Sequence, residues 1–235
     1  MIQAKNFDVV INCIGAIKQK GYSQVDMFAI NSILPKLLAR KVENTDTKIL
    51  HFTTDCVYKG ETEALLHENR EHDALDVYGL SKSLGEIQQE NVFNIRTSFV
   101  GPEQGSNYSL LSWFTSQERN AVINGFSRQY WNGIGSLQYS KIIEAIILRS
   151  NFSFPNNIHL LPRDYVSKYE LLLLFRDYFD REDVKIVRND HEDFIYRVLS
   201  TSYPEINASL WRLAGYTEIP TIEFMVRELS DAVSS

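Results

Sequence analysis

Three predominantly apolar runs stand out in the first hundred positions of the chain. They lie at residues 7–15, 48–54 and 92–100, and each leads into small or polar residues. Side chains alternate between the two faces of a strand, so an apolar run without alternation predicts a strand that is covered on both faces. We therefore expect three buried strands of a parallel sheet.

Between these runs the apolar residues recur with helical spacing. A first helix is expected from about residue 23 to 41, and a second from about 78 to 89. The order strand, helix, strand, loop, helix, strand is typical of right-handed crossovers in an open sheet. The expected fold class is α/β with a Rossmann-like parallel sheet.

The texture changes after Gly101, where Gly, Asn, Ser and aromatic residues become frequent. Ser167 and Glu170 have the spacing of a capping box that opens a helix. The elements expected in this half are two strands and three helices, at 157–161, 184–187, 136–149, 167–179 and 222–233. Residues 1–101 are expected to form one domain, and 102–235 mainly a second, smaller lobe from which the chain can cross back into the first.

Composition narrows the class of protein without pointing to a reaction. The 235 residues are 44% hydrophobic and 23% charged, which excludes general disorder. No apolar run approaches the roughly 18–20 residues that span a bilayer, and the first residues lack the apolar stretch of a secretory signal. The net charge of −6 argues against a nucleic-acid-binding protein, whose surface needs clustered Lys and Arg.

The two cysteines, Cys13 and Cys56, lie within apolar, strand-like runs. We expect both thiols to be buried and reduced, as in a cytoplasmic protein, and not paired in a disulfide. The five histidines are scattered without the spacing of metal ligands, so no metal site is expected.

The first candidate for chemistry is the pair Tyr78 and Lys82, which lie four residues apart on one helical face. A nearby cation stabilises a phenolate, so Lys82 is expected to lower the pKa of Tyr78 toward neutrality. Such a tyrosine can donate a proton to a carbonyl oxygen or take one from an alcohol. An exposed Tyr–Lys pair without function has the same spacing, so only the residues around the pair can distinguish a site from a surface pair.

Two neighbouring features favour a site. Thr54 follows the second strand, at the carboxyl end where open α/β sheets bind their ligands, and its hydroxyl could hydrogen-bond the oxygen that Tyr78 protonates. Asn31 precedes Pro35 by four residues, and because proline has no N–H, the Asn31 carbonyl is left free for a water or for the Lys82 ammonium. Taken singly, the first feature is more often a strand-end turn and the second more often a simple helix kink.

At this point the sequence is recognisable, because five motifs occur in order. They are Asp8-Val-Val-Ile-Asn-Cys-Ile-Gly15, Asn31 with Pro35, Phe52-Thr-Thr-Asp-Cys-Val-Tyr-Lys-Gly60, Tyr78-Gly-Leu-Ser-Lys82-Ser-Leu-Gly-Glu86 and Ile95-Arg-Thr-Ser-Phe-Val-Gly101. They resemble the extended short-chain dehydrogenase/reductase superfamily, and within it the dTDP-4-dehydrorhamnose reductase family. The stretches at 131–133 and 166–172 are similar to reductase-like members of surface-polysaccharide pathways.

The resemblance implies a role for each matched residue. Tyr78 would be the proton donor, Lys82 its pKa partner and a ligand of the nicotinamide ribose, and Thr54 would polarise a C4 keto group. Asn31 would support a proton relay. The cofactor, NADP or NAD, would also be lined by Cys13, Ile14, Gly15 and Thr53. The sugar would face Asp55 and Phe99, while Arg128 and Trp131 are candidates for contact with the nucleotide base or diphosphate, or else belong to a packing loop.

The implied activity is NAD(P)H-dependent reduction of a nucleotide-linked 4-keto-sugar for surface-polysaccharide biosynthesis. In the related 4,6-dehydratases a glutamate usually stands where this sequence has Cys56, which favours reduction over water elimination. Two alternatives stay open. One is a non-catalytic subunit that binds a sugar nucleotide or regulates a partner, and the other is a sugar-nucleotide epimerase.

The sequence differs from the family pattern in its N-terminal part. None of its 11 glycines is arranged as the Gly-rich turn that receives the cofactor pyrophosphate, so this N-terminal segment of the family is expected to be missing. A truncation, a split protein and a natural loss are the alternatives, and the chain by itself could lack activity. The strand within residues 8–15 would then offer an unpaired apolar edge, to be covered by a second copy or by a partner chain.

Overall fold

A four-stranded parallel sheet forms the framework of the molecule in the computed structural model, which describes residues 7–149, 152–191 and 193–234. The strand order is β1-β2-β3-β8, and every neighbouring pair is parallel. The strands are β1 (Val9–Asn12), β2 (Lys48–Thr53), β3 (Val92–Arg96) and β8 (Asn157–His159). The three strands expected from the apolar runs are confirmed, and so is the α/β class.

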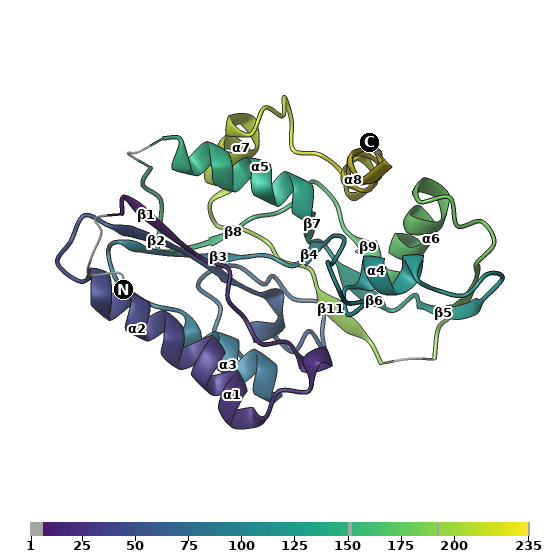
Figure 1. Cartoon of the computed structure of the whole chain (residues 1–235), viewed down its shortest axis with the longest axis horizontal. Coiled ribbons are helices and arrows are strands. Elements are labelled where there is room, and N and C mark those ends of the chain that lie inside the picture. The colour runs from purple at the N-terminus through teal and green to yellow at the C-terminus, as the bar shows by residue number, and fades with distance from the viewer. Residues whose placement is uncertain (1–6, 150–151, 192, 235) are drawn as a thin grey trace.

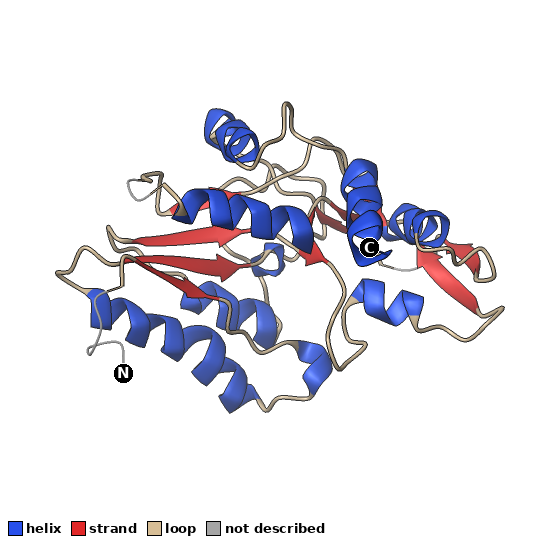
Figure 2. Cartoon of the chain, turned by 45° about the horizontal axis from the view of Figure 1, so that its top comes forward, coloured by secondary structure: helices blue, strands red, loops and turns tan. Residues whose placement is uncertain are grey.

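Helices cover both faces of this sheet (Figure 1). One face is covered by α1 (Gln24–Phe28), the π-helical turn η3 (Ala29–Ile33), α2 (Leu34–Val42) and α3 (Val77–Gly85). The other is covered by α5 (Ser136–Ile147), with α7 (Pro204–Leu213) beyond it. Figure 2 shows the resulting three layers from a second side.

The expected helix over residues 23–41 is present as three consecutive helical segments, α1, η3 and α2. The N–H of Leu34 bonds to the Ala29 carbonyl five residues back, so the path widens into a π turn just before Pro35. The missing N–H of Pro35 is tolerated next to a π turn, because the regular i→i−4 hydrogen bonds of the helix are already interrupted there. The second expected helix is shorter than predicted, because Glu86 takes extended dihedrals and ends α3 at Gly85.

The remaining strands and helices build the second lobe. Two strands pair in parallel, β5 (Val122–Phe126) with β10 (Lys185–Asn189), and β6 (Gln129–Trp131) lies between β11 (Ile195–Arg197) and β9 (Val166–Ser167). The last run of the first half continues past β3 as β4 (Phe99–Val100), which pairs with β7 (Ile134–Gly135). The other elements are α4 (Leu110–Thr115), α6 (Lys168–Tyr178), α8 (Ile222–Ser234) and the 3-10 turns η2 (Lys18–Lys20) and η4 (Asp55–Val57).

Several local predictions for this half are confirmed. Ser167 and Glu170 form the capping box that opens α6. The expected elements at 184–187 and 222–233 correspond to β10 and α8. Helix α7 was not foreseen, although Pro204 at its first turn is a usual start signal.

One hydrophobic core joins residues from both sides of position 101. Leu50 and Phe93 of the sheet belong to the same buried cluster as Ile142 of α5 and Trp211 of α7. Strand β8, from the second half of the sequence, adds to the edge of the first sheet beside β3. The domain boundary at 101 stays a prediction, and residues 1–6 of the expected first domain lie outside the described residues.

Strand β1 is an edge strand, since β2 is its one partner among the described residues. Apolar side chains are exposed along this edge, with Phe7 at 43%, Ile11 at 40% and Ile14 at 57% exposure. The expected unpaired apolar edge is therefore present. In the three described ranges, no helix is both long and apolar enough to cross a membrane.

Candidate active site

Tyr78 and Thr54 meet at the carboxyl end of β2. Helix α3 begins there, capped by the Asp76 side chain, which accepts a hydrogen bond of 3.1 Å from the Gly79 N–H. The helix packs very closely on the segment after β2, because a Cβ at Gly79 would stand 2.4 Å from the Cys56 carbonyl oxygen. This approach brings the Tyr78 phenol near the Thr54 side chain.

Lys82 lies one turn further along α3 and is buried, at 7% exposure. Its Nζ donates a hydrogen bond of 3.1 Å to the Phe52 carbonyl on β2. A Cβ at Gly15 would stand only 3.3 Å from this Nζ, so the segment after β1 passes directly beside the ammonium. Residues predicted from three separate motifs are thus neighbours in the fold.

The side chain of Asn31 holds the segment after β1 in place through hydrogen bonds to Ala16. Its amide oxygen accepts from the Ala16 N–H at 2.8 Å, and its amide nitrogen donates to the Ala16 carbonyl and to Ser81 Oγ, both at 3.0 Å. The backbone carbonyl of Asn31 was expected to hold either a water or the Lys82 ammonium. It lies instead against α3, where a Cβ at Gly85 would stand 2.0 Å from it, while Lys82 bonds to β2.

The predicted lowering of the Tyr78 pKa is wrong for this structure. Burial raises the pKa of Tyr78, and the acidic neighbours Cys56, Asp55 and Asp76 raise it further, against a lowering by the hydrogen bond with Thr54. Burial also acts on the lysine, lowering the pKa of Lys82 to about 8. Desolvation is the largest cause of both shifts, since each group loses water around its charged form.

The segment predicted to line the cofactor is open at the surface. Cys13, Ile14 and Gly15 are all exposed, because they follow the edge strand β1. The expectation of buried thiols is therefore wrong for Cys13, and Cys56 is half-buried; both cysteines are free. Without a side chain at Gly15, a flat ring can approach the backbone beside Lys82, so the residues present fit the nicotinamide half of a dinucleotide.

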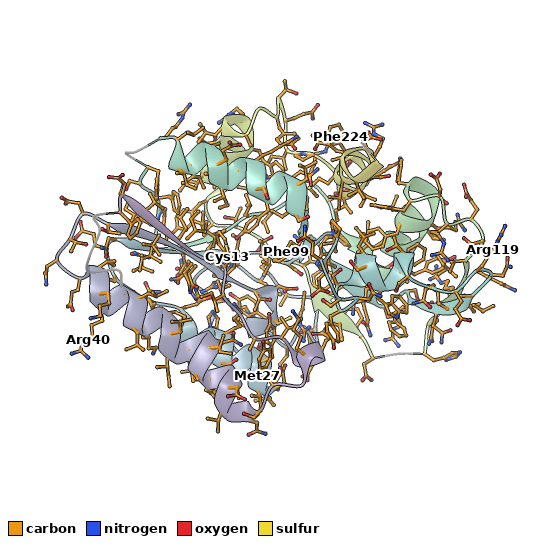
Figure 3. The ribbon with its side chains drawn as sticks, in the orientation of Figure 1. Cys13, Met27, Arg40, Phe99, Arg119 and Phe224 are labelled. Atoms are coloured by element: carbon orange, nitrogen blue, oxygen red, sulfur yellow. The ribbon has the colours of Figure 1, made fainter. Side chains whose placement is uncertain are left out.

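Two of the predicted substrate residues lie at this end of the sheet. Asp55 is buried and accepts a hydrogen bond of 3.0 Å from the Thr54 hydroxyl. Phe99 is 59% exposed and stacks on Tyr139 of α5, with ring centroids 5.9 Å apart. Figure 3 labels Phe99 and Cys13 near the middle of the molecule, where the first sheet ends.

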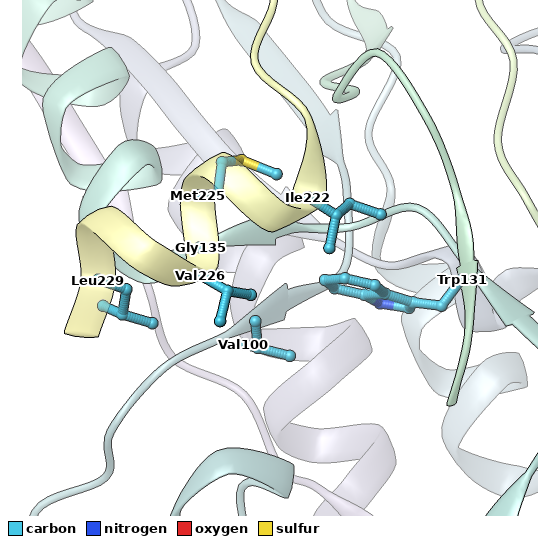
Figure 4. Close-up of a pocket in the computed structure, with 7 residues that line it drawn as sticks. All are labelled: Val100, Trp131, Gly135, Ile222, Met225, Val226 and Leu229. Carbon is cyan, nitrogen blue, oxygen red and sulfur yellow. The ribbon is translucent and has the colours of Figure 1, made fainter. Parts of the chain in front are cut away.

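The other two predicted substrate residues are not placed alike. Arg128 is exposed, with its guanidinium 6.0 Å above the Phe194 ring. Trp131 lies within the hydrophobic core, where its indole is 8% exposed, and its predicted contact with the nucleotide stays a prediction. It lines a narrow apolar gap with no room for a water molecule, opposite Ile222 and Met225 of α8 (Figure 4).

Arg197 and Lys168 are two cations of the second lobe that sequence reasoning missed. Arg197 Nε donates to the Tyr58 carbonyl at 2.9 Å, and its Nη1 lies 3.7 Å from the Cys56 sulfur. Burial lowers the pKa of Lys168, the charge of Arg197 lowers it further, and the acidic Cys56 and Asp55 oppose the change. No local motif marks either residue, since Arg197 and Cys56 are 141 positions apart in the sequence.

The histidines do not gather into a site. Burial lowers the pKa of His51 to about 4, and its Nε2 is buried without a hydrogen-bond partner. His159 is buried between the Arg96 guanidinium, 3.1 Å from its Nε2, and the Ser200 carbonyl, 2.6 Å from its Nδ1. Across the described part of the chain, no group of three or more His, Cys, Asp or Glu residues is arranged to hold a metal ion.

A parallel α/β sheet with a Tyr–Lys helix beside a threonine at a strand end defines the extended short-chain dehydrogenase/reductase superfamily. Within it, the family model described as RmlD substrate binding domain matches residues 1–196. The chain belongs to this family.

Individual proteins that resemble this chain share less than 30% of its sequence in the matched regions. The probable low-salt glycan biosynthesis reductase Agl14 of Haloferax volcanii is 28% identical over 125 residues, which cover 48% of this chain and 40% of that protein. A dTDP-4-dehydrorhamnose reductase from Clostridium acetobutylicum has a similar structure, with a TM-score of 0.79 at 19% identity over 100% of this chain and 84% of that one. The structure of the dTDP-4-dehydrorhamnose reductase from Bacillus anthracis, solved in complex with NADP, is also similar. Its TM-score is 0.77 at 16% identity, and the match covers 100% of this chain and 83% of that one.

Proposed function

We propose that the chain carries the catalytic residues of an NAD(P)H-dependent reductase acting on the 4-keto group of a nucleotide-linked sugar. The observation that carries this proposal is the close packing of α3 on the segment after β2, which brings Tyr78 near Thr54, with Lys82 one turn along the same helix. The names of the relatives, a glycan biosynthesis reductase and dTDP-4-dehydrorhamnose reductases, support the choice of reaction and substrate.

In this proposal the two hydroxyls bind the keto oxygen of the substrate together. The raised pKa of Tyr78 keeps its proton in place until negative charge develops on that oxygen, as a general acid requires. The Lys82 ammonium, anchored to the Phe52 carbonyl, then stabilises the phenolate that remains. NADPH or NADH, bound along Cys13–Gly15, supplies the hydride.

The second lobe is proposed to hold the nucleotide part of the substrate. Arg197 and Lys168 bring two positive charges to the segment that carries Asp55, where a diphosphate can accept charge-assisted hydrogen bonds. Next to Arg197, the rings of Tyr130, Tyr165 and Tyr196 lie within 6 Å of one another and offer surface for a base. Phe99 and Asp55 would face the sugar.

The test is a turnover assay with the purified chain, NADPH and a dTDP- or UDP-4-keto-sugar, followed by the loss of NADPH absorbance. The Tyr78→Phe variant should lose activity by about 10²–10⁴-fold, because it removes the proton donor. Calorimetry on the same variant should show that it still binds the sugar nucleotide. Binding without turnover in the unaltered chain would favour the non-catalytic subunit, and interconversion of two sugars without net NADPH loss would favour the epimerase.

We also propose that the edge of β1 is covered in the working protein, by a second copy or by a partner chain. Its support is the exposed apolar edge of Phe7, Ile11 and Ile14. Light scattering during gel filtration separates the two forms of this idea, because only self-association doubles the mass of the purified chain. A cytoplasmic location and a role in surface-polysaccharide biosynthesis complete the proposal.

A further inference from the structure

A buried ion pair clamps the end of the catalytic helix to the sheet. Glu86 directly follows α3, and its carboxylate accepts from Arg96 Nε at 2.6 Å and Arg96 Nη2 at 2.5 Å, with Thr53 Oγ1 at 3.1 Å as a third donor. The two charged side chains are 6% and 2% exposed. Helix α3 is thereby tied to β2 and to β3 at the same point.

The guanidinium of this pair is held on its other side as well. Arg96 Nη1 donates to the Tyr58 hydroxyl at 3.2 Å and to the Glu68 carbonyl at 3.0 Å, and it lies 3.1 Å from His159 Nε2. Burying two charges costs more than a hydrophobic pair of the same volume would, so a pair of this kind is weak evidence for stability. Its position next to the catalytic helix suggests a function.

Glu86 lies four residues after Lys82, at the same end of α3. Burial lowers the pKa of Lys82, and two groups oppose this change: Glu86, which directly follows α3, and Cys56, in the segment after β2. His51 of β2 also faces Lys82 and is neutral. The carboxylate itself is faced by Arg96 and, at 3.7 Å, by His72 Nε2.

We propose that Glu86, held by Arg96, is a positioning residue that fixes the end of α3 and keeps the Lys82 ammonium charged under the ligand site. An ionised Glu86 balances the Arg96 guanidinium 2.5 Å away. Removing the carboxylate leaves that guanidinium unbalanced in the buried region next to α3, and Lys82 also loses the charge of Glu86, so the lysine should release its proton at a lower pH. For catalysis this inference rests on the proposed reductase function.

The experiment measures the titration of Lys82 by NMR in protein labelled with carbon-13 at the lysine Cε, with its signal assigned by Lys82→Arg. In Glu86→Gln the Lys82 midpoint should fall below the value of the unaltered protein. In the double variant Glu86→Gln/Arg96→Gln it should return toward that value, because both charges are gone. A merely structural clamp predicts no such return.

Controls separate this result from general damage. Glu228→Gln breaks another ion pair, between Glu228 and Lys141 at 2.5 Å, and should leave the Lys82 titration unchanged. If Glu86→Gln does not fold, Arg96→Gln carries the test, because it leaves the Glu86 carboxylate without its partner and should raise the Lys82 midpoint. An unchanged Lys82 midpoint in folded Glu86→Gln, or in folded Arg96→Gln where it replaces that variant, overturns the inference.

The titration needs no turnover, so the two proposals can fail separately. A shifted Lys82 midpoint in a chain without reductase activity would leave the positioning role in place and reject the function. In an active chain, Glu86→Gln should lower kcat while the KM for the sugar nucleotide stays constant, and the activity should be lost at a lower pH than in the unaltered enzyme.

Discussion

Replacing Gly79 by alanine tests whether the close packing of α3 creates the active site. Within a helix this change alone is favourable by about 1 kcal/mol, because alanine is the better helix former. Here the new Cβ would lie 2.4 Å from the Cys56 carbonyl oxygen and 2.5 Å from the Ala74 Cβ. Overpacking of this kind costs about 1–3 kcal/mol, and a cost near the upper end is expected here because the Cys56 carbonyl belongs to the backbone and cannot rotate away. After the gain in helix formation is subtracted, the free energy of unfolding should fall by about 1–2 kcal/mol.

The structural consequence should be visible in the activity. To relieve the contact, α3 has to move away from the segment after β2, which separates Tyr78 from Thr54. A displacement near 1 Å in a catalytic group costs about a hundredfold in rate, so kcat should fall by about that factor in a protein that remains folded. Urea unfolding gives the free energy, and the NADPH assay gives kcat.

A second substitution shows whether the reasoning is correct. Adding Ala74→Gly to Gly79→Ala removes one of the two close contacts and should restore part of the stability, whereas Ala74→Gly alone should destabilise. If Gly79→Ala is more stable than the unaltered chain by the helix-forming gain, then α3 does not pack as closely as described. In that case the account of how Tyr78 meets Thr54 fails with it.

Three further predictions follow from charged groups. Arg197→Met and Lys168→Met should each raise the KM for the sugar nucleotide with little change in kcat, while the matched exposed variant Arg128→Met should change the KM far less; equal effects would reject the diphosphate site. Reductase activity should fall as the pH rises through about 8, where Lys82 loses its proton, and a profile flat to pH 10 would contradict its role. His51 has a folded pKa of about 4, below its usual 6.5, so the unfolded chain binds the proton first and stability falls as the pH falls between these values. His51→Gln should lose less stability over that interval in urea titrations, and an equal loss would show that His51 is not the group responsible.

The sequence reveals what depends on near neighbours along the chain. The buried strands were recognisable because a strand covered on both faces needs an apolar run, which is a local property. The same holds for the capping box at Ser167, and for the spacing that puts Tyr78 and Lys82 on one side of α3. The resemblance of the motifs to reductases added the site residues, and Gly15, Asn31, Thr54, Tyr78 and Lys82 do lie together in the fold.

What depends on distant parts of the chain had to come from the structure. Trp131 belongs to the hydrophobic core because α8, about ninety positions later, packs over it. Arg197 reaches the site because the Tyr196 N–H bonds to the Gly60 carbonyl, a pairing that no local pattern indicates. The shifts in the pKa of Tyr78 and Lys82 are likewise properties of burial.

The sequence by itself therefore determined the α/β class, the parallel strands and the helix that carries the Tyr–Lys pair, because each is encoded in the periodicity of a short segment. Tertiary structure decided which cations lie near Cys56 and Asp55, which aromatic side chains are buried, and in which direction the pKa values of Tyr78 and Lys82 are moved. Those properties depend on desolvation and on charges brought together by folding, and neither has a signature in the order of nearby residues.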